Sequence, residues 1–338
     1  MKSASLAMLL FLAGICVSPV TGSFGGSKSA IVVDAAPTGF ARLSLGLETF
    51  GKLEFRGGLV LSSPDPRFGG FSGLALSASG DALMAVSDDG WWFKADVDYE
   101  NGRPSALTEA TLEPLLDREG RRSTSKQRRD AEALALDPPG QMGASAFVGF
   151  EMRPRIEKFD LRAKGLAARP VPVPSPAGLR NGPYNGQLEA LGKLTQGPWK
   201  GALIALSERN LDSRGNIRGW IIDGKKGRTF SLARHEDYAI TDLAVLRDGT
   251  IVTLERSFGG SVLPGMALRR FSLNDLKNGA TIMPEILFSG RQPFYLIDNM
   301  EGIAAHQWRN EERITVISDD NYNRGVQRTV MFQFALSP

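Results

Sequence analysis

Residues 132–151 read EALALDPPGQMGASAFVGFE, in which one carboxylate opens a short apolar run and another closes a second run. Similar pairs of runs occur four more times. The first runs are SGLAL at Ser72, EALGKL at Glu189, TDLAVL at Thr241 and EGIAAH at Glu301. The second runs are LMAVSDD ending at Asp88 and Asp89, ALIALSE at Glu208, TIVTLE at Glu255 and TVISDD at Asp319 and Asp320. The first runs begin 60, 57, 52 and 60 residues apart, so the chain is a repeat protein.

Each repeat contains four apolar runs with the character of β-strands. Between Ser72 and Glu132 the runs are FSGLALS, ALMAVSD, WWFKADV and ALTEATLEPLL. They are short, rich in branched and aromatic residues, and bounded by Gly, Asp, Asn and Pro, which are turn residues. Five repeats of four strands predict an all-β fold, a β-propeller with five blades.

The two ends of the chain predict how the ring closes. The last repeat stops at Pro338 without a fourth strand, and KLEFRGGLVLSS at 52–63 precedes the first repeat. We expect this N-terminal strand to complete the C-terminal blade, because that arrangement removes two exposed sheet edges. The run FARLSLGLETF at 40–50 leaves six blades as the alternative, if it forms a blade of its own.

Composition and the N-terminus bound the functional class. The 338 residues carry a net charge of only +3, which gives no electrostatic support for nucleic-acid binding. Residues 1–23 resemble a cleaved secretory signal, with an apolar core too short for a membrane anchor. We therefore expect one propeller domain over 24–338, periplasmic or secreted, monomeric and not inserted in a membrane. Cys16 is the single cysteine, so the mature chain has no thiol chemistry.

The repeated carboxylates are predicted to meet at one end of the ring. Neighbouring strands of a blade run antiparallel, so the start of the first strand lies beside the end of the second. The loops at that end also carry arginines, including the basic passage REGRRSTSKQRRD before Glu132. The candidate metal ligands on this rim are Asp88, Glu132, Glu151, Glu189, Glu208, Glu255, Glu301 and Asp319.

Glu132, Glu189 and Glu301 are the candidates for a catalytic role. A strand start is an unfavourable place for glutamate, yet three of the five repeats have one there. If these carboxylates converge, a hard cation such as Ca²⁺ can relieve their repulsion. Two interpretations compete with a metal site. Each glutamate can pair with an arginine, and strand alternation places Glu132 on the same face as Leu134, toward a blade interface.

Arg129, Arg153, Arg209 and Arg256 are the candidate substrate clamps, because guanidinium groups bind phosphate or carboxylate in a bidentate manner. Other catalytic classes find little support. The two histidines, His235 and His306, do not accompany a GxSxG elbow, although His235 is expected on the carboxylate rim. The sequence also lacks zinc-ligand spacing and a phosphate-cradling glycine loop.

Several motifs in the same order resemble those of the phytase-like family named for the esterase-like activity of phytase, which comprises predicted exported bacterial proteins. The motifs are SGLAL…AVSDDG, RDAEALAL…FVGFE, NGQLEAL…ALSER, TDLAVL…TLERSF, LRRFSL and NMEGIA…ISDDN, within residues 50 to 336. The resemblance implies a propeller that hydrolyses esters or phosphate esters. The RHGxRxP signature of histidine phosphatases is missing, so any phytase-like chemistry would resemble that of calcium-dependent propeller phytases.

These observations together predict an exported hydrolase that cleaves a small anionic ester with the help of Ca²⁺ or another divalent cation. One alternative is a lactonase-like propeller enzyme, in which a similar cation polarises a neutral lactone. The other alternative is a propeller that binds a ligand or protein without turnover.

Overall fold

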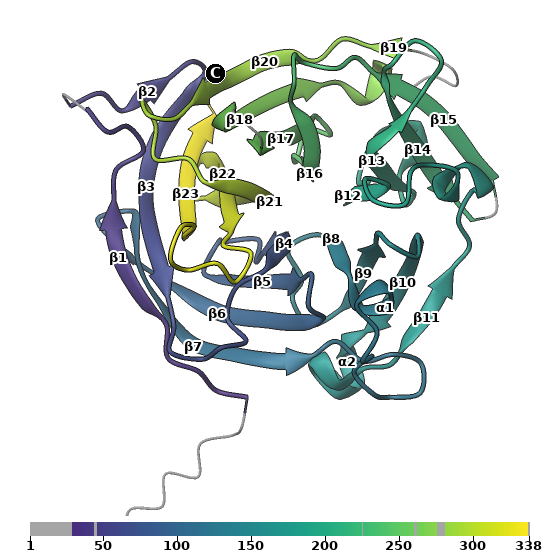
Figure 1. Ribbon diagram of the computed structural model, residues 1–338, viewed down its shortest axis with the longest axis horizontal. Coiled ribbons are helices and arrows are strands. Elements are labelled where there is room, and N and C mark those ends of the chain that lie inside the picture. The colour runs from purple at the N-terminus through teal and green to yellow at the C-terminus, as the bar shows by residue number, and fades with distance from the viewer. Residues whose placement is uncertain (1–28, 44–45, 225, 260–261, 276–280, 337–338) are drawn as a thin grey trace, which may run out of the picture.

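The computed structural model describes residues 29–43, 46–224, 226–259, 262–275 and 281–336. Within these residues five β-sheets surround a common centre, so the prediction of an all-β, five-bladed β-propeller is confirmed (Figure 1). Two short α-helices, α1 (Lys126–Arg129) and α2 (Leu161–Lys164), lie in the connections. No helix in the described part of the chain has the length and apolar character of a membrane span. The predicted signal segment, residues 1–23, lies outside the described residues.

The first four blades follow the chain in order. Blade 1 contains β4 (Phe71–Leu76), β5 (Ala82–Ser87), β6 (Trp91–Glu100) and β7 (Arg103–Pro114). Blade 2 contains β8 (Ala131–Asp137), β9 (Ser145–Phe150), β10 (Arg155–Asp160) and β11 (Pro170–Val173). Blade 3 contains β12 (Leu188–Lys193), β13 (Leu203–Leu211), β14 (Ile217–Asp223) and β15 (Lys226–Leu232), with β19 (Thr281–Ile282) parallel to β15. Blade 4 contains β16 (Ala239–Val245), β17 (Ile251–Gly259), β18 (Val262–Phe271) and β20 (Glu285–Arg291).

Blade 5 closes the ring with strands from both ends of the chain. It contains β21 (Asn299–Trp308), β22 (Glu311–Asp319) and β23 (Thr329–Leu336), and its fourth strand is β3 (Leu53–Ser62). β3 pairs antiparallel with β23, as the purple and yellow strands of Figure 1 show. The outer edge of β3 is covered by β1 (Asp34–Thr38). The predicted closure by an N-terminal strand is therefore confirmed.

The run at 40–50 does not form a sixth blade. Its only strand within the described residues is β2 (Thr49–Phe50), which pairs with β3 and so extends blade 5. The reason is aromatic packing, because the buried ring of Phe40 lies 4.9 Å from Phe334 and 5.2 Å from Phe332. Phe40 and Phe50 of this run therefore belong to the hydrophobic core that contains Phe332 and Phe334 of blade 5.

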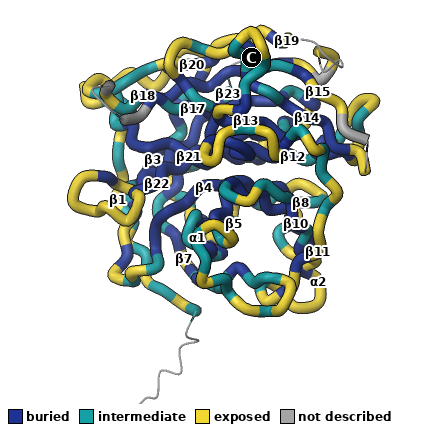
Figure 2. Tube along the Cα trace, turned by 45° about the vertical axis from the view of Figure 1, so that its right-hand side comes forward, coloured by how far each residue is buried: buried dark blue, intermediate teal, exposed yellow. Residues whose placement is uncertain are grey.

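The cores lie between blades, and the innermost strands pack closely around the centre. Trp92 of blade 1 meets Phe159 of blade 2 edge to face at 5.3 Å in one such core. The innermost strands β4, β8, β12, β16 and β21 contact one another around the ring. A Cβ atom added at Gly302 would collide with the carbonyl oxygen of Ser72, so the contact there needs glycine. Figure 2 shows that buried residues dominate these inner strands, whereas exposed residues lie mainly in the loops.

Candidate active site

A β-bulge at the start of each innermost strand shifts its register, and in four of the five blades the side chain of the bulge residue lines a cavity at the centre of the ring. In blade 2 the register shifts between Ala131 and Ala133, which leaves Glu132 as the extra residue. Ala131 packs in the core shared with blade 1, whereas Ala133 packs in the core shared with blade 3. Residues two apart normally share a face, so the bulge has reversed the alternation. Glu132 consequently lines a central cavity, not the blade interface that regular alternation with Leu134 indicated.

The same shift occurs in every blade. It lies between Leu188 and Ala190, between Ile240 and Asp242, and between Met300 and Gly302 in blades 3, 4 and 5. In blade 1 it lies between Phe71 and Leu74. The residues carried by the five bulges are Ser72, Glu132, Glu189, Thr241 and Glu301.

A second set of side chains enters from the ends of the neighbouring strands. Ser207 lies opposite Leu188, the residue before the bulge of blade 3, and Glu208 follows it. In blade 4 the residue opposite Ile240 is Glu255, so Arg256 takes the place that Glu208 has in blade 3. The equivalent residues of the five blades are Asp88, Glu151, Glu208, Arg256 and Asp319.

Except for Thr241, whose hydroxyl donates to the Met300 carbonyl, these two sets line one cavity of about 230 Å³ at the centre of the ring, which we call the carboxylate cavity. It gathers eight carboxyl groups and two cationic groups. Seven of the eight predicted ligands are among its lining, and Glu255 is not. The carboxyl groups are Asp88, Asp130, Glu132, Glu151, Glu189, Glu208, Glu301 and Asp319, and the cationic groups are Lys126 and Arg256.

Burial and mutual repulsion favour the protonated forms of these carboxyl groups. Removal from water, followed by the charges of neighbouring carboxylates, raises the pKa of Glu132 and of Glu189 well above the usual range. Burial also raises the pKa of Glu151, although a hydrogen bond with Glu189 and the backbone N–H of Gly186 oppose the rise. Burial raises the pKa of Glu301 to about 7 against the pull of Arg256. In the absence of a cation, the cavity therefore holds protons.

Lys126 and Arg256 neutralise opposite sides of the cavity. Lys126 Nζ donates to Asp88 Oδ2 at 2.7 Å and lies 2.6 Å from Asp130 Oδ1. Arg256 Nη1 lies 3.0 Å from Glu301 Oε1, and Arg256 Nη2 lies 3.7 Å from Glu208 Oε1. The Nε atom of Arg256 is buried and has no hydrogen-bond partner among the described residues, so this guanidinium retains a free donor.

Two sets of three carboxyl-bearing residues have the spacing of metal ligands. Asp130, Glu132 and Glu151 form one group, and Glu151, Glu189 and Glu208 form the other, with ligand atoms within 4.8 Å of one another in each. The Oδ1 atom of Asp88 and the Oδ2 atom of Asp130 are buried without hydrogen-bond partners in the described part of the chain. A hard cation takes six to eight oxygen ligands, so this donor set fits an ion of the calcium type.

Glu255 lies outside the carboxylate cavity, contrary to its prediction as a ligand. Its Oε1 atom accepts hydrogen bonds from Arg269 Nε at 2.6 Å and from Thr253 Oγ1 at 2.9 Å, and the residue is fully buried. The physical reason is register, since Glu255 occupies the place of the buried Ser207 in blade 3. Alignment of the apolar runs by their final glutamate misplaces blade 4 by one residue.

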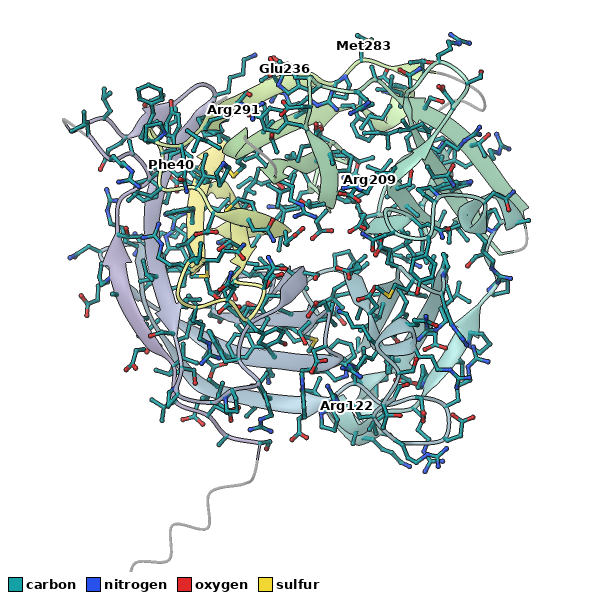
Figure 3. All side chains as sticks on the ribbon, viewed as in Figure 1. Phe40, Arg122, Arg209, Glu236, Met283 and Arg291 are labelled. Atoms are coloured by element: carbon teal, nitrogen blue, oxygen red, sulfur yellow. The ribbon has the colours of Figure 1, made fainter. Side chains whose placement is uncertain are left out.

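The four predicted arginine clamps divide among different sites. Only Arg256 lines the carboxylate cavity. Arg129 binds Asp89, with Nε 2.7 Å from Oδ1, and Arg153 lines a separate pocket near α1. Arg209 pairs with Glu208 and lines an adjoining hollow of about 410 Å³ that also includes Arg256. Figure 3 shows Arg209 toward the middle of the ring.

The two histidines do not line the carboxylate cavity. His235 lies 3.3 Å from the Ser289 hydroxyl through Nε2 and stacks on Tyr238, so it is on a different part of the rim. His306 is buried near the other end of β21, where it pairs with Arg313 in the ladder. Burial and the charge of Arg313 lower the pKa of His306 to about 4, so this ring is neutral near pH 7.

Sequence reasoning missed several residues of the cavity. Asp130 and Lys126 line the cavity and belong to the basic passage before β8. The sequence analysis treated that passage only as a source of arginines. Asp130 had a usable signal, since it stands two residues before Glu132 at the start of a repeat. Asn185 and Asn321 come from loops and carry no signal that the repeat pattern could reveal.

Several solved structures are similar to this chain at low sequence identity. Among solved structures, U3-55K is similar at 8% identity over 80% of this chain and 96% of that chain, with a TM-score of 0.41. The β-propeller domain of Cps50 (Swd1) from Myceliophteria thermophila gives 9% identity, 91% and 100% coverage, and a TM-score of 0.37. Dihydro-heme d1 dehydrogenase NirN gives 12% identity, 80% and 48% coverage, and a TM-score of 0.34. Similarity at this distance does not indicate function.

A search of curated proteins finds no match. The profile of the phytase-like family, described as "esterase-like activity of phytase", matches residues 66–322. The match extends from the segment before blade 1 to the loop after β22, and therefore includes every residue that lines the carboxylate cavity. This chain belongs to the phytase-like family.

Proposed function

We propose that this protein is an exported hydrolase of a small anionic ester, either a phosphate or a carboxylic ester, with a divalent cation of the calcium type in the carboxylate cavity. The observation that carries the proposal is the convergence of eight carboxyl groups and Arg256 on one cavity. Membership of the phytase-like family supports hydrolysis as the reaction class. The sequence of residues 1–23 supports export.

The geometry supports distinct roles for the two sides of the cavity. Glu132, Glu151 and Glu189, with Asp130 and Glu208, would hold the cation, and Glu151 belongs to both ligand groups. When bound, a divalent cation polarises an ester oxygen and lowers the pKa of an attacking water. Arg256, which lines the cavity, would bind the anionic part of the substrate through its guanidinium group.

Glu301 is the proposed general base. It belongs to neither ligand group, and its carboxyl group is held by Arg256 Nη1 and by Asn299 Nδ2, which donates to Oε1 at 2.9 Å. A carboxylate fixed beside a substrate-binding arginine is placed to accept a proton from the attacking water. Activity should therefore need Glu301 even when the cation is bound normally.

The proposal is tested by metal content and turnover of the purified protein. We expect a stoichiometric divalent ion, and hydrolysis of p-nitrophenyl phosphate or a carboxylate-bearing ester that stops on chelation and returns with Ca²⁺. Glu189→Gln should lower the affinity for the divalent ion and abolish turnover. Glu301→Gln should bind the ion with unchanged affinity but lower kcat at least a hundredfold. Glu100→Gln, an exposed residue of β6, is the matched control.

The outcomes separate the alternatives. Cleavage of a neutral lactone without cleavage of anionic esters would indicate the lactonase-like enzyme instead. A protein that contains no divalent ion and turns over none of these substrates would contradict the proposal and indicate a binding protein.

A further inference from the structure

A second polar pocket lies beside the carboxylate cavity and is rich in arginine. It has a volume of about 240 Å³ and lies where α1, the turn after β9 and the start of β10 meet. We call it the arginine pocket. The lining groups that matter here are Arg118, Ser123, Arg128, Arg153, Arg155 and Glu157.

One carboxylate serves two of the four guanidinium groups. Glu157 Oε1 accepts from Arg118 Nη2 at 3.0 Å and lies 3.4 Å from Arg155 Nε. Arg155 also donates to the backbone carbonyls of Arg128 and Arg153, which ties both segments to the pocket. Arg128 and Arg153 themselves form no ion pair within the described residues.

The remaining acidic neighbours do not balance these charges. Asp117 Oδ1 accepts the backbone N–H groups of Glu119 and Arg121, each at 3.0 Å, so it is engaged in its own turn. Glu119 is exposed at the edge of the pocket. Burial lowers the pKa of Arg155 against the opposing effect of Glu157, and the charges of Arg118 and Arg128 also lower it. The pocket therefore presents an excess of positive charge that an anion would relieve.

We propose that the arginine pocket binds a phosphate-type oxyanion, either free or as the end group of a phosphate monoester. The planar guanidinium forks of Arg128 and Arg153 match the oxygen spacing of phosphate. The Ser123 hydroxyl accepts the backbone N–H of Ser125 at 3.3 Å, which leaves its own hydrogen for an anion oxygen.

This site is separate from the carboxylate cavity, although the two are adjacent. They share no lining residue. α1 contributes Lys126 to the cavity and Arg128 to the pocket, and the turn after β9 contributes Met152 to the cavity and Arg153 to the pocket. Anion binding at the arginine pocket should therefore not require a divalent cation.

The test is calorimetric titration of the full, metal-stripped protein with inorganic phosphate at constant ionic strength. We expect one saturable site, a rise in Tm with phosphate, and at least a tenfold loss of affinity in the double variant Arg128→Gln and Arg153→Gln. The matched control is Arg162→Gln with Arg214→Gln, which removes two exposed arginines elsewhere and should bind phosphate normally. Arg128 and Arg153 are exposed, so both double variants should fold, as circular dichroism can check.

Glycerol phosphate distinguishes the two sources of the anion. Binding of both ligands supports recognition of a phosphate end group, and binding of inorganic phosphate alone supports a site for the free ion. The proposal is overturned if phosphate shows no saturable binding, if the Arg128 and Arg153 variant binds it normally, or if the control variant loses affinity equally.

Discussion

At the scale of single residues, the protein places carboxyl groups in positions where they cannot all be ionised without a cation. Glu132 and Glu189 have pKa values raised well above the usual range, first by burial and then by the negative charges of the carboxylates around them. Such perturbed carboxyl groups in a cavity are typical of functional sites. Two properties of individual residues lead to predictions.

The first prediction concerns pH. The pKa of Glu301 rises from its ordinary 4.5 to about 7 in the folded protein. Between these values the folded state binds more protons than the unfolded state, so the free energy of unfolding falls as pH rises. For Glu301 alone the fall is on the order of 3 kcal/mol without a cation. Thermal unfolding of chelated protein should therefore show a lower Tm at pH 7 than at pH 4.5.

Added Ca²⁺ should weaken this dependence, because the positive charge of a nearby ion favours the ionised form of Glu301 and lowers its pKa. Glu301→Gln should reduce the slope in chelated protein without removing it, since the glutamine does not titrate whereas Glu132 and Glu189 still do. A Tm that rises with pH in the chelated wild type would contradict the prediction.

Glu208 and Glu255 each end the second apolar run of a repeat, but we predict that only Glu208 binds the cation and that Glu255 stabilises the fold. Glu255→Gln leaves Arg269 buried without its charged partner, so we expect a loss of about 3 kcal/mol in the free energy of unfolding. The affinity of the Glu255→Gln protein for a divalent cation should not change. Glu208→Gln should lower the affinity for the cation at least tenfold and should reduce the free energy of unfolding by less than Glu255→Gln does. Denaturant unfolding and calcium titration of both variants decide the matter, and weaker calcium binding by Glu255→Gln would contradict the assignment.

At the scale of elements, the bulge at the start of each innermost strand is the device that builds the site. In every blade except blade 4 it brings an extra side chain into the central cavity, while the apolar faces still pack between blades. The neighbouring strand ends supply the second set of groups. Blade 4 differs from blades 2 and 3 at these two register positions. It has Thr241 and Arg256 there, whereas blades 2 and 3 each have two glutamates.

This difference predicts that blade 4 is the side on which the anionic substrate binds. Arg256→Gln should raise KM at least tenfold, because the substrate loses its guanidinium partner, while the cation binds as tightly or more tightly. Arg256→Lys, which keeps the charge but not the fork, should recover only part of the affinity. Steady-state kinetics with parallel calcium titrations would show this. A variant with unchanged KM and weakened calcium binding would show that Arg256 instead supports the ligands.

At the scale of the whole molecule, the site depends on a closed ring. The carboxylate cavity takes groups from every blade, and blade 5 has its fourth strand only because β3 pairs with β23. Phe40 and Phe55 from the N-terminal segment pack with Phe332 and Phe334 beneath that pairing. Closure therefore couples the start of the chain to a cavity that lies far from it in sequence.

Removal of residues 1–62 should leave β23 and the side of blade 1 exposed and make the protein aggregate or lose cooperative unfolding. Removal of residues 1–23 alone, the predicted signal segment, is the control and should leave the Tm unchanged. Thermal unfolding and size-exclusion chromatography measure both. A cooperatively folded monomer without residues 1–62 would contradict the role of β3 in closure.

The sequence alone determined the repeat, the blade order and the strand that closes the ring, because apolar periodicity and turn residues are local properties of the chain. It also identified seven of the carboxyl groups that line the cavity. Only the tertiary structure decided that Glu255 is replaced by Arg256 at the centre, and that Lys126 and Asp130 join the site. The reason is that β-bulges and strand register depend on pairing between strands, and a shift of one residue moves a side chain from the cavity to the core.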